Sequence, residues 1–321
     1  MTFITDIVST YVHESEVSAI KEMAMLSAGV PDAVSLTWGL PSFQTPAYIR
    51  EGIMQKLATD PDAGKYTLPD GLAELRSCVV AEHKRKTGIE VDAEDHVMIS
   101  AGNMQGLNTL FHTMLDPGDE IILTDPCFAS HVQQIKLFSG VPVYWPLDES
   151  NDWSLDIDLL AELITDKTQA IVLVSPSNPT GKIFTEAELR RVGQIAREHD
   201  ILIIIDDPYS DFVYENGDKA FNLACDASLK DHLVYLYSFS KAYAMSGWRL
   251  SYMVMPEELK NEAMKVHDAT MICAPRISQL AGIIALSQPS QHKQEFGAVL
   301  ARRRELICQR LDNTRDLFSY R

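Results

Sequence analysis

The chain has 321 residues, of which 46% are hydrophobic and 23% are charged. These proportions are ordinary for globular proteins and exclude a fibrous or disordered chain. At about 100–200 residues per domain, the length predicts one large domain or two smaller ones. The chain carries 28 Lys and Arg against 45 Asp and Glu, a formal net charge of −17. This acidity argues against nucleic acid and anionic membranes as main partners, because polyanions attract clusters of Lys and Arg.

The amino terminus and the cysteine content predict a cytoplasmic protein. The first residues show no basic segment followed by an apolar core, so they do not resemble a secretory signal. No apolar run approaches the roughly 18 residues of a membrane-spanning helix. The five cysteines include no C-x-x-C pair, which is typical of reduced thiols. The nine histidines show no paired spacing such as H-x-x-x-H, so we expect no metal site built from protein ligands.

The first 45 residues contain one predicted helix and one long loop. The helix candidate is Ser18–Leu26, which has an amphipathic pattern. The loop-rich stretch LTWGLPSFQTP follows and ends at residue 46. This segment differs from the alternating pattern of the residues after it.

From about residue 95 to residue 256, short apolar segments alternate with longer segments of helical periodicity. The apolar segments are His96–Ser100, Glu120–Thr124, Pro142–Trp145, Ala170–Ser175, Ile201–Asp206, Leu233–Ser238 and Leu250–Met255. Several are apolar throughout, as expected for strands of a largely parallel sheet that helices cover on both faces. We therefore predict a three-layer α/β/α domain. Ligands of such domains bind at the carboxyl ends of the strands.

The predicted helices lie between and after these strands. Gly106–Leu115 is one, and Glu186–His199 is another, introduced by Thr185 with Glu188 three residues later, which is the pattern of a capping box. Residues 283–314 predict one long helix, in which Arg302–Arg304 forms a basic cluster that we interpret as a solvated face. The final residues, DLFSYR, predict the start of another strand.

Polar side chains follow several of the predicted strands directly. The turn Ser100–Gln105 leads into a helix, and N–H groups at a helix amino terminus bind phosphate well. Many turns between a strand and a helix contain glycine without binding any ligand, so this pattern alone is weak. Asp206 ends a buried strand, where a carboxylate needs a cationic or hydrogen-bonding partner. Tyr209 follows it closely, and Asn178 lies in the proline-rich turn after another strand.

The most informative segment is Ser238-Phe239-Ser240-Lys241, directly after the strand residues Leu233–Tyr237, with Arg249 close behind. Desolvation lowers the pKa of a lysine and makes it a nucleophile for carbonyl carbon. Two hydroxyls and an arginine suit a phosphate group. Together with the carboxylate, the phenol and the amide at neighbouring strand ends, this set predicts a site for pyridoxal phosphate.

Six segments, in the right order, resemble the motifs of class I and II aminotransferases, the fold type I pyridoxal-phosphate enzymes. They are VSLTWGLPSFQTP, YTLPDGLAELR, DPCFASH, SPSNPTG, DDPY and SFSKAYAMSGWR. The resemblance runs from about residue 30 to the end of the chain. It implies a three-layer α/β/α sandwich with a mostly parallel seven-stranded sheet. It also implies amino transfer between an L-amino acid and a 2-oxo acid by a ping-pong mechanism.

The resemblance further implies a role for each matching residue. Lys241 is similar to the lysine that binds the cofactor as a Schiff base and then moves a proton between the substrate and the cofactor. Asp206 matches the acid that pairs with the pyridine N–H. Asn178 and Tyr209 match the donors to the ring oxygen, and Phe128 matches the aromatic residue that stacks on the ring.

For the phosphate, the resemblance implies contacts from backbone N–H groups of Asn103 and Met104 and from the side chains of Ser238 and Arg249. Tyr66 matches a tyrosine that reaches the phosphate in the neighbouring subunit. This match implies a homodimer with shared active sites.

For the substrate, the resemblance implies contacts from the loop around Gly39 and from Asn178. The family's arginine for the substrate α-carboxylate has no match here, and we expect it beyond residue 321. Arg276 lies where partner residues approach the substrate side chain in relatives, and it is expected to favour a distal carboxylate. A surface or dimer-interface arginine is an equally good interpretation.

The domain organisation implied is an amino-terminal arm with part of a small domain over residues 1–45 and a large cofactor domain over 46–282. Residues 283–321 would form the helix leading into the small domain, whose carboxyl-terminal part we expect to be absent. Two alternatives share the cofactor residues. One is a carbon–sulfur lyase or aminocyclopropane-carboxylate-synthase type of lyase, and the other is a non-catalytic cofactor-binding module.

Overall fold

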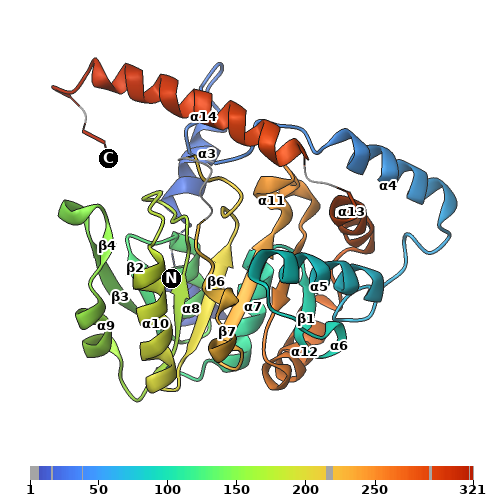
Figure 1. Ribbon diagram of the computed structural model, residues 1–321, viewed down its shortest axis with the longest axis horizontal. Coiled ribbons are helices and arrows are strands. Elements are labelled where there is room, and N and C mark those ends of the chain that lie inside the picture. Colours follow the sequence, from blue (N-terminus) through green and yellow to red (C-terminus); the bar gives the residue numbers. More distant parts are fainter. Residues whose placement is uncertain are drawn as a thin grey trace.

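A mostly parallel sheet forms the centre of the molecule (Figure 1). The computed structural model describes residues 7–15, 17–37, 39–214, 220–288, 291–317 and 319–320. The strands lie in the order β1-β8-β7-β6-β5-β2-β3-β4. Their bounds are β1 Val97–Ser100, β2 Glu120–Asp125, β3 Val141–Asp148, β4 Ser154–Leu155, β5 Thr168–Leu173, β6 Leu202–Asp207, β7 Leu233–Ser238 and β8 Ser251–Val254.

All seven apolar segments predicted as strands are strands, and the α/β class is confirmed. The pairs β2–β3, β2–β5, β5–β6 and β6–β7 are parallel, whereas β8 runs antiparallel to both β1 and β7. The sheet differs from the seven-stranded prediction by β4, which pairs antiparallel with the end of β3. A strand of only two residues is too short to show an alternating pattern in the sequence. Their pairing depends on a turn in which Asp152 and Trp153 both have positive φ.

Helices cover both faces of the sheet, as the three-layer prediction requires (Figure 1). One face packs against α5, α9, α10 and α13, and the other against α7, α8 and α12. The bounds of the helices are α2 Thr10–Glu14, α3 Ala19–Ala28, α4 Ala47–Thr59, α5 Ala73–Thr87, α6 Ala93–His96, α7 Asn103–Met114, α8 Ala129–Leu137, α9 Ile157–Leu163, α10 Glu186–Glu198, α11 Phe239–Ala242, α12 Glu257–Met271, α13 Arg276–Leu286 and α14 Gln291–Asp312.

The prediction of one long helix over residues 283–314 is wrong, because two helices occupy this stretch. α13 ends at Leu286, and α14 begins at Gln291. The sequence has a proline at position 289, and proline lacks the N–H that would continue a helix. The expected domain boundary at residue 282 therefore lies inside α13. We propose the break between α13 and α14 as the boundary instead.

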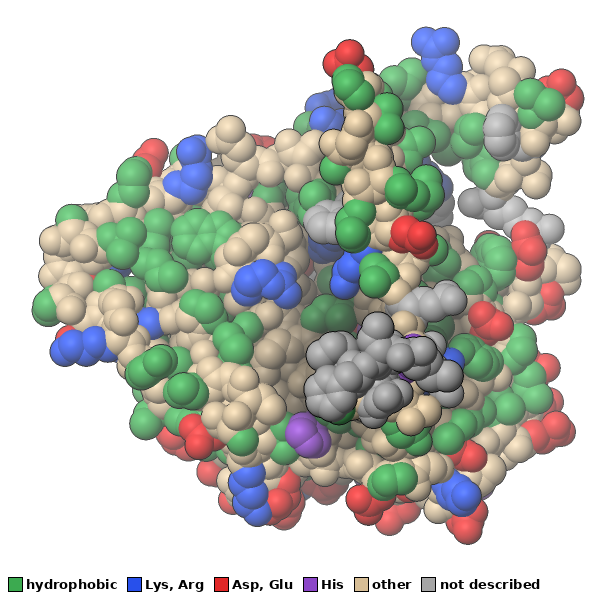
Figure 2. All heavy atoms as spheres, turned by 180° about the vertical axis from the view of Figure 1, so that it is seen from behind, with side chains coloured by type: hydrophobic (Ala, Val, Ile, Leu, Met, Phe, Trp, Pro, Cys, Tyr) green, Lys and Arg blue, Asp and Glu red, His purple; other side chains and the backbone are tan. Residues whose placement is uncertain are grey.

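The helix α14 crosses above the upper edge of the sheet (Figure 1). It contacts the loop that precedes α4, where Phe296 stacks on Phe43 with 4.0 Å between the ring centroids. The predicted amphipathic helix is present as α3, which buries none of its residues within this chain. Figure 2 shows hydrophobic side chains on the back face of the molecule, interspersed with charged ones.

None of the described helices combines the length and apolar character that crossing a bilayer requires. The described His, Cys, Asp and Glu side chains form no group of three that would hold a metal ion.

The start of α10 offers a test of local stability. Thr185 Oγ1 accepts from Glu188 N at 3.2 Å, and Glu188 Oε2 accepts from Thr185 N at 2.7 Å, which completes the predicted capping box. We expect Thr185→Ala to lower the free energy of unfolding by about 1 kcal/mol, because the Glu188 N–H loses its acceptor. Urea unfolding measures the difference. Thr185→Ser keeps the acceptor, so an equal loss in that variant would contradict the explanation.

Candidate active site

Five strands bring polar residues to one edge of the sheet. β5, β6 and β7 are mutually parallel, so the segments after them emerge together. These segments carry Asn178, Tyr209 and Lys241, and Asp206 lies at the end of β6 itself. β8 is antiparallel to both β1 and β7, so its first residue meets the last residues of those strands. Arg249, just before β8, therefore reaches the same edge.

Asp206 is the buried centre of this edge, with only 6% of its surface exposed. Asn103 Nδ2 donates to its Oδ1 at 2.5 Å, and His131 Nε2 donates to its Oδ2 at 3.0 Å. Asn103 is the first residue of α7, and His131 lies in the first turn of α8. A carboxylate offers about four lone-pair sites, so Asp206 can accept a further N–H from a ligand.

Lys241 lies on the short helix α11, and its side chain is partly buried. Its Nζ donates to the carbonyl of Gly39 at 2.7 Å and lies 6.0 Å from the centroid of the Tyr209 ring. Burial lowers the pKa of the Lys241 amine, because a desolvated ammonium is less stable than one in water. A larger fraction of the amine is therefore neutral at a given pH, which is the form that attacks carbonyl carbon.

Tyr209 and Asn178 form a pair of polar groups on the two adjacent loops. Asn178 Nδ2 lies 3.4 Å from Tyr209 Oη. Burial raises the pKa of Tyr209, the charge of Asp206 raises it further, and the contact with Asn178 lowers it. The phenol is thus a neutral hydrogen-bond donor at neutral pH.

The turn between β1 and α7 forms a second polar group together with Arg249. Arg249 Nη1 donates to Ser246 O at 2.9 Å, and Nη2 donates to Ala101 O at 3.3 Å. Gly102 has φ of +86°, and a Cβ built there would lie 2.3 Å from Arg249 Nη2. Only glycine allows this approach. The first N–H groups of α7, including those of Asn103 and Met104, have no acceptor within the helix.

The hydroxyl of Ser238 already takes part in one hydrogen bond within the chain. Its side chain is buried, and its Oγ accepts from Ser240 N at 3.1 Å, which caps α11. Its hydroxyl hydrogen remains available to a ligand, because that contact uses only a lone pair.

Three further predicted site residues are Phe128, Tyr66 and Arg276. Phe128 precedes α8 and meets His131 edge-on, with 5.3 Å between the ring centroids. Tyr66 lies on the loop between α4 and α5 and is 75% exposed. Arg276 begins α13, where its Nη2 is 3.8 Å from Asp60 Oδ2. Its Nε is buried without a hydrogen-bond partner among the described residues.

Sequence reasoning missed two residues of this site, His131 and Gly102. His131 follows Phe128 by three residues in the DPCFASH segment, so one helical turn carries its ring toward the same strand edge. The three-residue spacing from Phe128 could therefore have identified His131 from the sequence. Gly102 belongs to the turn Ser100–Gln105, but its close approach to Arg249 depends on tertiary structure.

These residues fit pyridoxal phosphate. Asp206 is a buried carboxylate with spare acceptor capacity, and Lys241 is an amine whose pKa burial lowers. The Oδ1 atom of Asn103 is buried without a hydrogen-bond partner in the described part of the chain, which is an unfilled acceptor inside the site. The close approach of Arg249 to Gly102 places a guanidinium beside the free N–H groups of α7. This combination suits a phosphate dianion.

Comparison with known proteins supports the same interpretation. A family model described as "Aminotransferase class I and II" matches residues 31–319. The aspartate aminotransferase of Pyrococcus horikoshii is 34% identical over 298 residues, which cover 92% of this chain and 75% of that protein. Aromatic-amino-acid aminotransferase 2 of Thermococcus litoralis is 32% identical, covering 92% of this chain and 76% of the relative.

A solved structure agrees in three dimensions. Aspartate aminotransferase from Thermus thermophilus with maleate superposes with a TM-score of 0.88 at 30% identity, covering 95% of this chain and 80% of the other. At this identity and coverage the likeness extends beyond the fold class. The chain therefore belongs to the class I and II aminotransferases, enzymes that use pyridoxal 5′-phosphate to transfer amino groups.

Proposed function

We propose that Lys241, Asp206, Asn178, Tyr209 and Arg249 carry the amino transfer between an L-amino acid and a 2-oxo acid. The observation that best supports this proposal is the meeting of a buried carboxylate and a partly buried amine of lowered pKa at one sheet edge. Titratable groups whose pKa is perturbed, as that of Lys241 is, gather at catalytic sites. When bound, the cofactor supplies an electron sink for the bond that breaks at the substrate α-carbon.

Each residue has a distinct proposed task. Lys241 would hold the cofactor covalently, and its amine would carry a proton to and from the substrate α-carbon. Asp206 accepts the ring N–H and keeps that proton in place, while Asn103 and His131 hold its carboxylate in position. Tyr209 orients the cofactor by donating to its ring oxygen.

The remaining contacts position the cofactor and the substrate. Asn178 is proposed to donate to the ring oxygen and to contact the substrate. Phe128 is proposed to stack on the ring and exclude water from one face. Arg249, Ser238 and the N–H groups of Asn103 and Met104 are proposed to bind the phosphate. The carbonyl of Gly39 already contacts Lys241, and its loop is proposed to close over the substrate.

The protein is proposed to work as a cytoplasmic homodimer in which each active site uses residues of both subunits. Several large apolar side chains near Tyr66 are exposed within one chain, among them Met54, Leu57 and Leu68. Exposed apolar patches commonly mark protein interfaces. Tyr66 is proposed to reach the cofactor phosphate of the partner. Arg276 is proposed to reach a distal carboxylate of the partner's substrate through its unpaired Nε.

The role of Lys241 gives a direct test. We expect Lys241→Ala to lose the covalent linkage to the cofactor that borohydride traps, and to transfer amino groups at least about 10²–10⁴-fold more slowly. Mass spectrometry of the reduced protein and an assay for the exchanged amino group measure both effects. Lys136→Ala, an exposed position on α8, is the control. Release of ammonia and pyruvate in place of amino-group exchange would show a lyase instead.

The phosphate turn gives a second test. Gly102→Ala adds a Cβ that collides with Arg249 and strains a residue with positive φ. We expect weaker binding of pyridoxal phosphate and a loss of about 1–3 kcal/mol in the free energy of unfolding. Spectroscopic titration and urea unfolding measure the two effects. Gly247→Ala is the matched control, since nothing lies within 4 Å of a Cβ there. Equal cofactor affinity in the two variants would refute the proposed phosphate turn.

The shared site gives a third test. A mixture of Tyr66→Ala and Lys241→Ala chains, unfolded and refolded together, should recover up to about a quarter of wild-type sites, because each heterodimer regenerates one intact site. Cofactor binding and amino transfer are both measured. If the mixture recovers no activity although each variant alone forms a dimer, the assignment of Tyr66 is wrong.

A mixture of Arg276→Gln and Lys241→Ala chains tests Arg276 in the same way. Recovery of amino transfer is then expected for dicarboxylic substrates only.

A further inference from the structure

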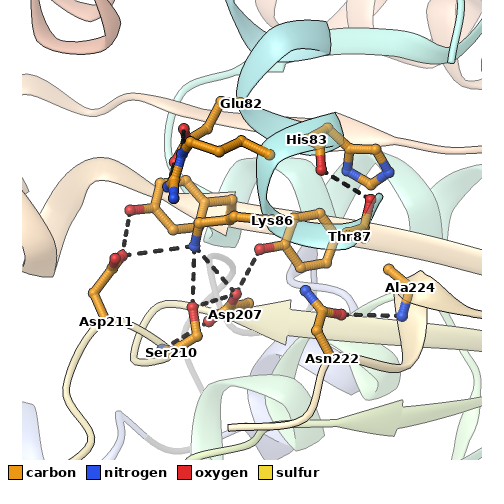
Figure 3. Close-up of polar contacts among 12 residues, drawn as sticks. Glu82, His83, Lys86, Thr87, Asp207, Ser210, Asp211, Asn222 and Ala224 are labelled. Atoms are coloured by element: carbon orange, nitrogen blue, oxygen red, sulfur yellow. Dashed lines mark hydrogen bonds and ion pairs between the residues drawn. The ribbon is translucent and has the colours of Figure 1, made fainter. Parts of the chain in front are cut away.

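A buried network of charges lies directly beside Tyr209, and the proposed chemistry does not use it. Asp207 precedes Tyr209 by two residues, and Ser210 and Asp211 follow it. Figure 3 shows these side chains converging on Lys86, which extends from the last turn of α5. The network therefore holds the backbone on both sides of Tyr209.

Lys86 contacts three members of this loop. Its Nζ donates to Ser210 Oγ at 3.1 Å and lies 3.9 Å from Asp207 Oδ2 and 3.6 Å from Asp211 Oδ2. It also lies 3.9 Å from the centroid of the Tyr237 ring, a favourable cation–π distance. One ammonium thus links both carboxylates.

Asp207 is tied into the sheet. It is 2% exposed, and it accepts from Tyr235 Oη at 2.5 Å. It also accepts from Ser210 N at 2.9 Å and from Ser210 Oγ at 2.7 Å. These contacts fix the turn that contains Tyr209 to the neighbouring strand β7.

Asp211 connects the same loop to a different part of the fold. It accepts from Tyr237 Oη at 2.6 Å and from Lys293 Nζ at 3.0 Å, and Lys293 lies in the first turn of α14. Burial alone would raise the pKa of Asp211, but the charges of Lys86 and Lys293 and the hydrogen bonds from Tyr237 and Lys293 hold it well below its usual range. The carboxylate is therefore ionised at neutral pH.

The helix α14 also contacts a second segment that reaches Lys241. Phe296, one turn after Lys293, stacks on Phe43. Phe43 lies four residues after Gly39, whose carbonyl accepts from Lys241 Nζ. The first turns of α14 therefore contact both the Tyr209 loop and the segment that contacts Lys241.

The network is balanced in charge, with one lysine each from α5 and α14, one aspartate at the end of β6 and one in the loop after it. Removing one member leaves a buried charge without its partner, which is strongly unfavourable, whereas removing an opposite pair leaves the remainder neutral. The position of α14 and the conformation of the Tyr209 loop are thus energetically linked.

We propose that Asp211 is a positioning residue through which Lys293 of α14 holds Tyr209 in place for the cofactor, so that cofactor binding and the docking of α14 are coupled. The proposal rests on the role proposed for Tyr209. Asp211 touches neither cofactor nor substrate and acts only through the loop. Because α14 also contacts the Gly39 segment, one helix coordinates two segments that approach Lys241.

The test compares Asp211→Asn, Lys293→Met, the double variant and Lys293→Arg. The measurements are the Kd for pyridoxal phosphate and the pH midpoint of the absorbance of the bound cofactor. We expect each of the first two variants to bind the cofactor about tenfold more weakly, the loss typical when a residue that orients a ligand group is removed, and to shift the midpoint. The fold-loss of cofactor affinity in the double variant should be smaller than the product of the two single-variant losses. Lys293→Arg should retain most of the affinity.

Leu160→Ala is the control for general destabilisation, since Leu160 is fully buried in α9 on another part of the sheet. We expect it to unfold at lower urea with an unchanged absorbance midpoint. Tyr209→Phe separates the two proposals. If Tyr209→Phe shifts the midpoint and Asp211→Asn does not, the positioning role is wrong and the function of Tyr209 stands. If neither variant shifts it, the role of Tyr209 itself is wrong.

Discussion

Two consecutive buried carboxylates at the end of β6 are the constraint on which the site depends. Side chains alternate across a strand, so Asp206 and Asp207 point to opposite faces of the sheet, as Ile204 and Ile205 do before them. Neither carboxylate is stable there without partners. Asp206 takes an amide donor from α7 and an imidazole donor from α8, and its remaining lone pairs are available to a ligand. Asp207 accepts a hydrogen bond from a tyrosine on the α5 face, and the charge of a lysine from α5 balances its own.

The residues that sequence reasoning found are those whose position follows from strand order alone. Parallel strands end at one edge, so Asp206, Asn178 and Lys241 could be brought together from the positions of apolar runs and turns. His131 needed one further step, the turn of helix after DPCFASH. Lys86 and Lys293 lie far from Asp211 in the chain. No local pattern distinguishes such lysines from solvated ones, because only tertiary packing buries them.

The same distinction explains the errors in the fold. The long apolar strands were predicted correctly, because a strand that is buried on both faces of the sheet has a continuous apolar sequence. The strand β4 is too short for any pattern, and it pairs because the chain folds back after β3. The break between α13 and α14 was marked by the proline at position 289. The sequence nevertheless predicted one helix, because helical periodicity is present on both sides of this proline, although proline seldom continues a helix.

The break has a structural consequence for the site. A single continuous helix would extend α13 in its own direction, but a separate α14 is free to take another and crosses above the sheet edge (Figure 1). That course brings Lys293 to Asp211 and Phe296 to Phe43. Both contacts lie within two turns of the start of α14, so a small rotation there moves them together. A buried ion pair responds steeply to such displacement, because its stability requires close geometry. The first two turns of α14 are thus where a movement of this helix would reach both the loop that carries Tyr209 and the segment whose Gly39 carbonyl contacts Lys241.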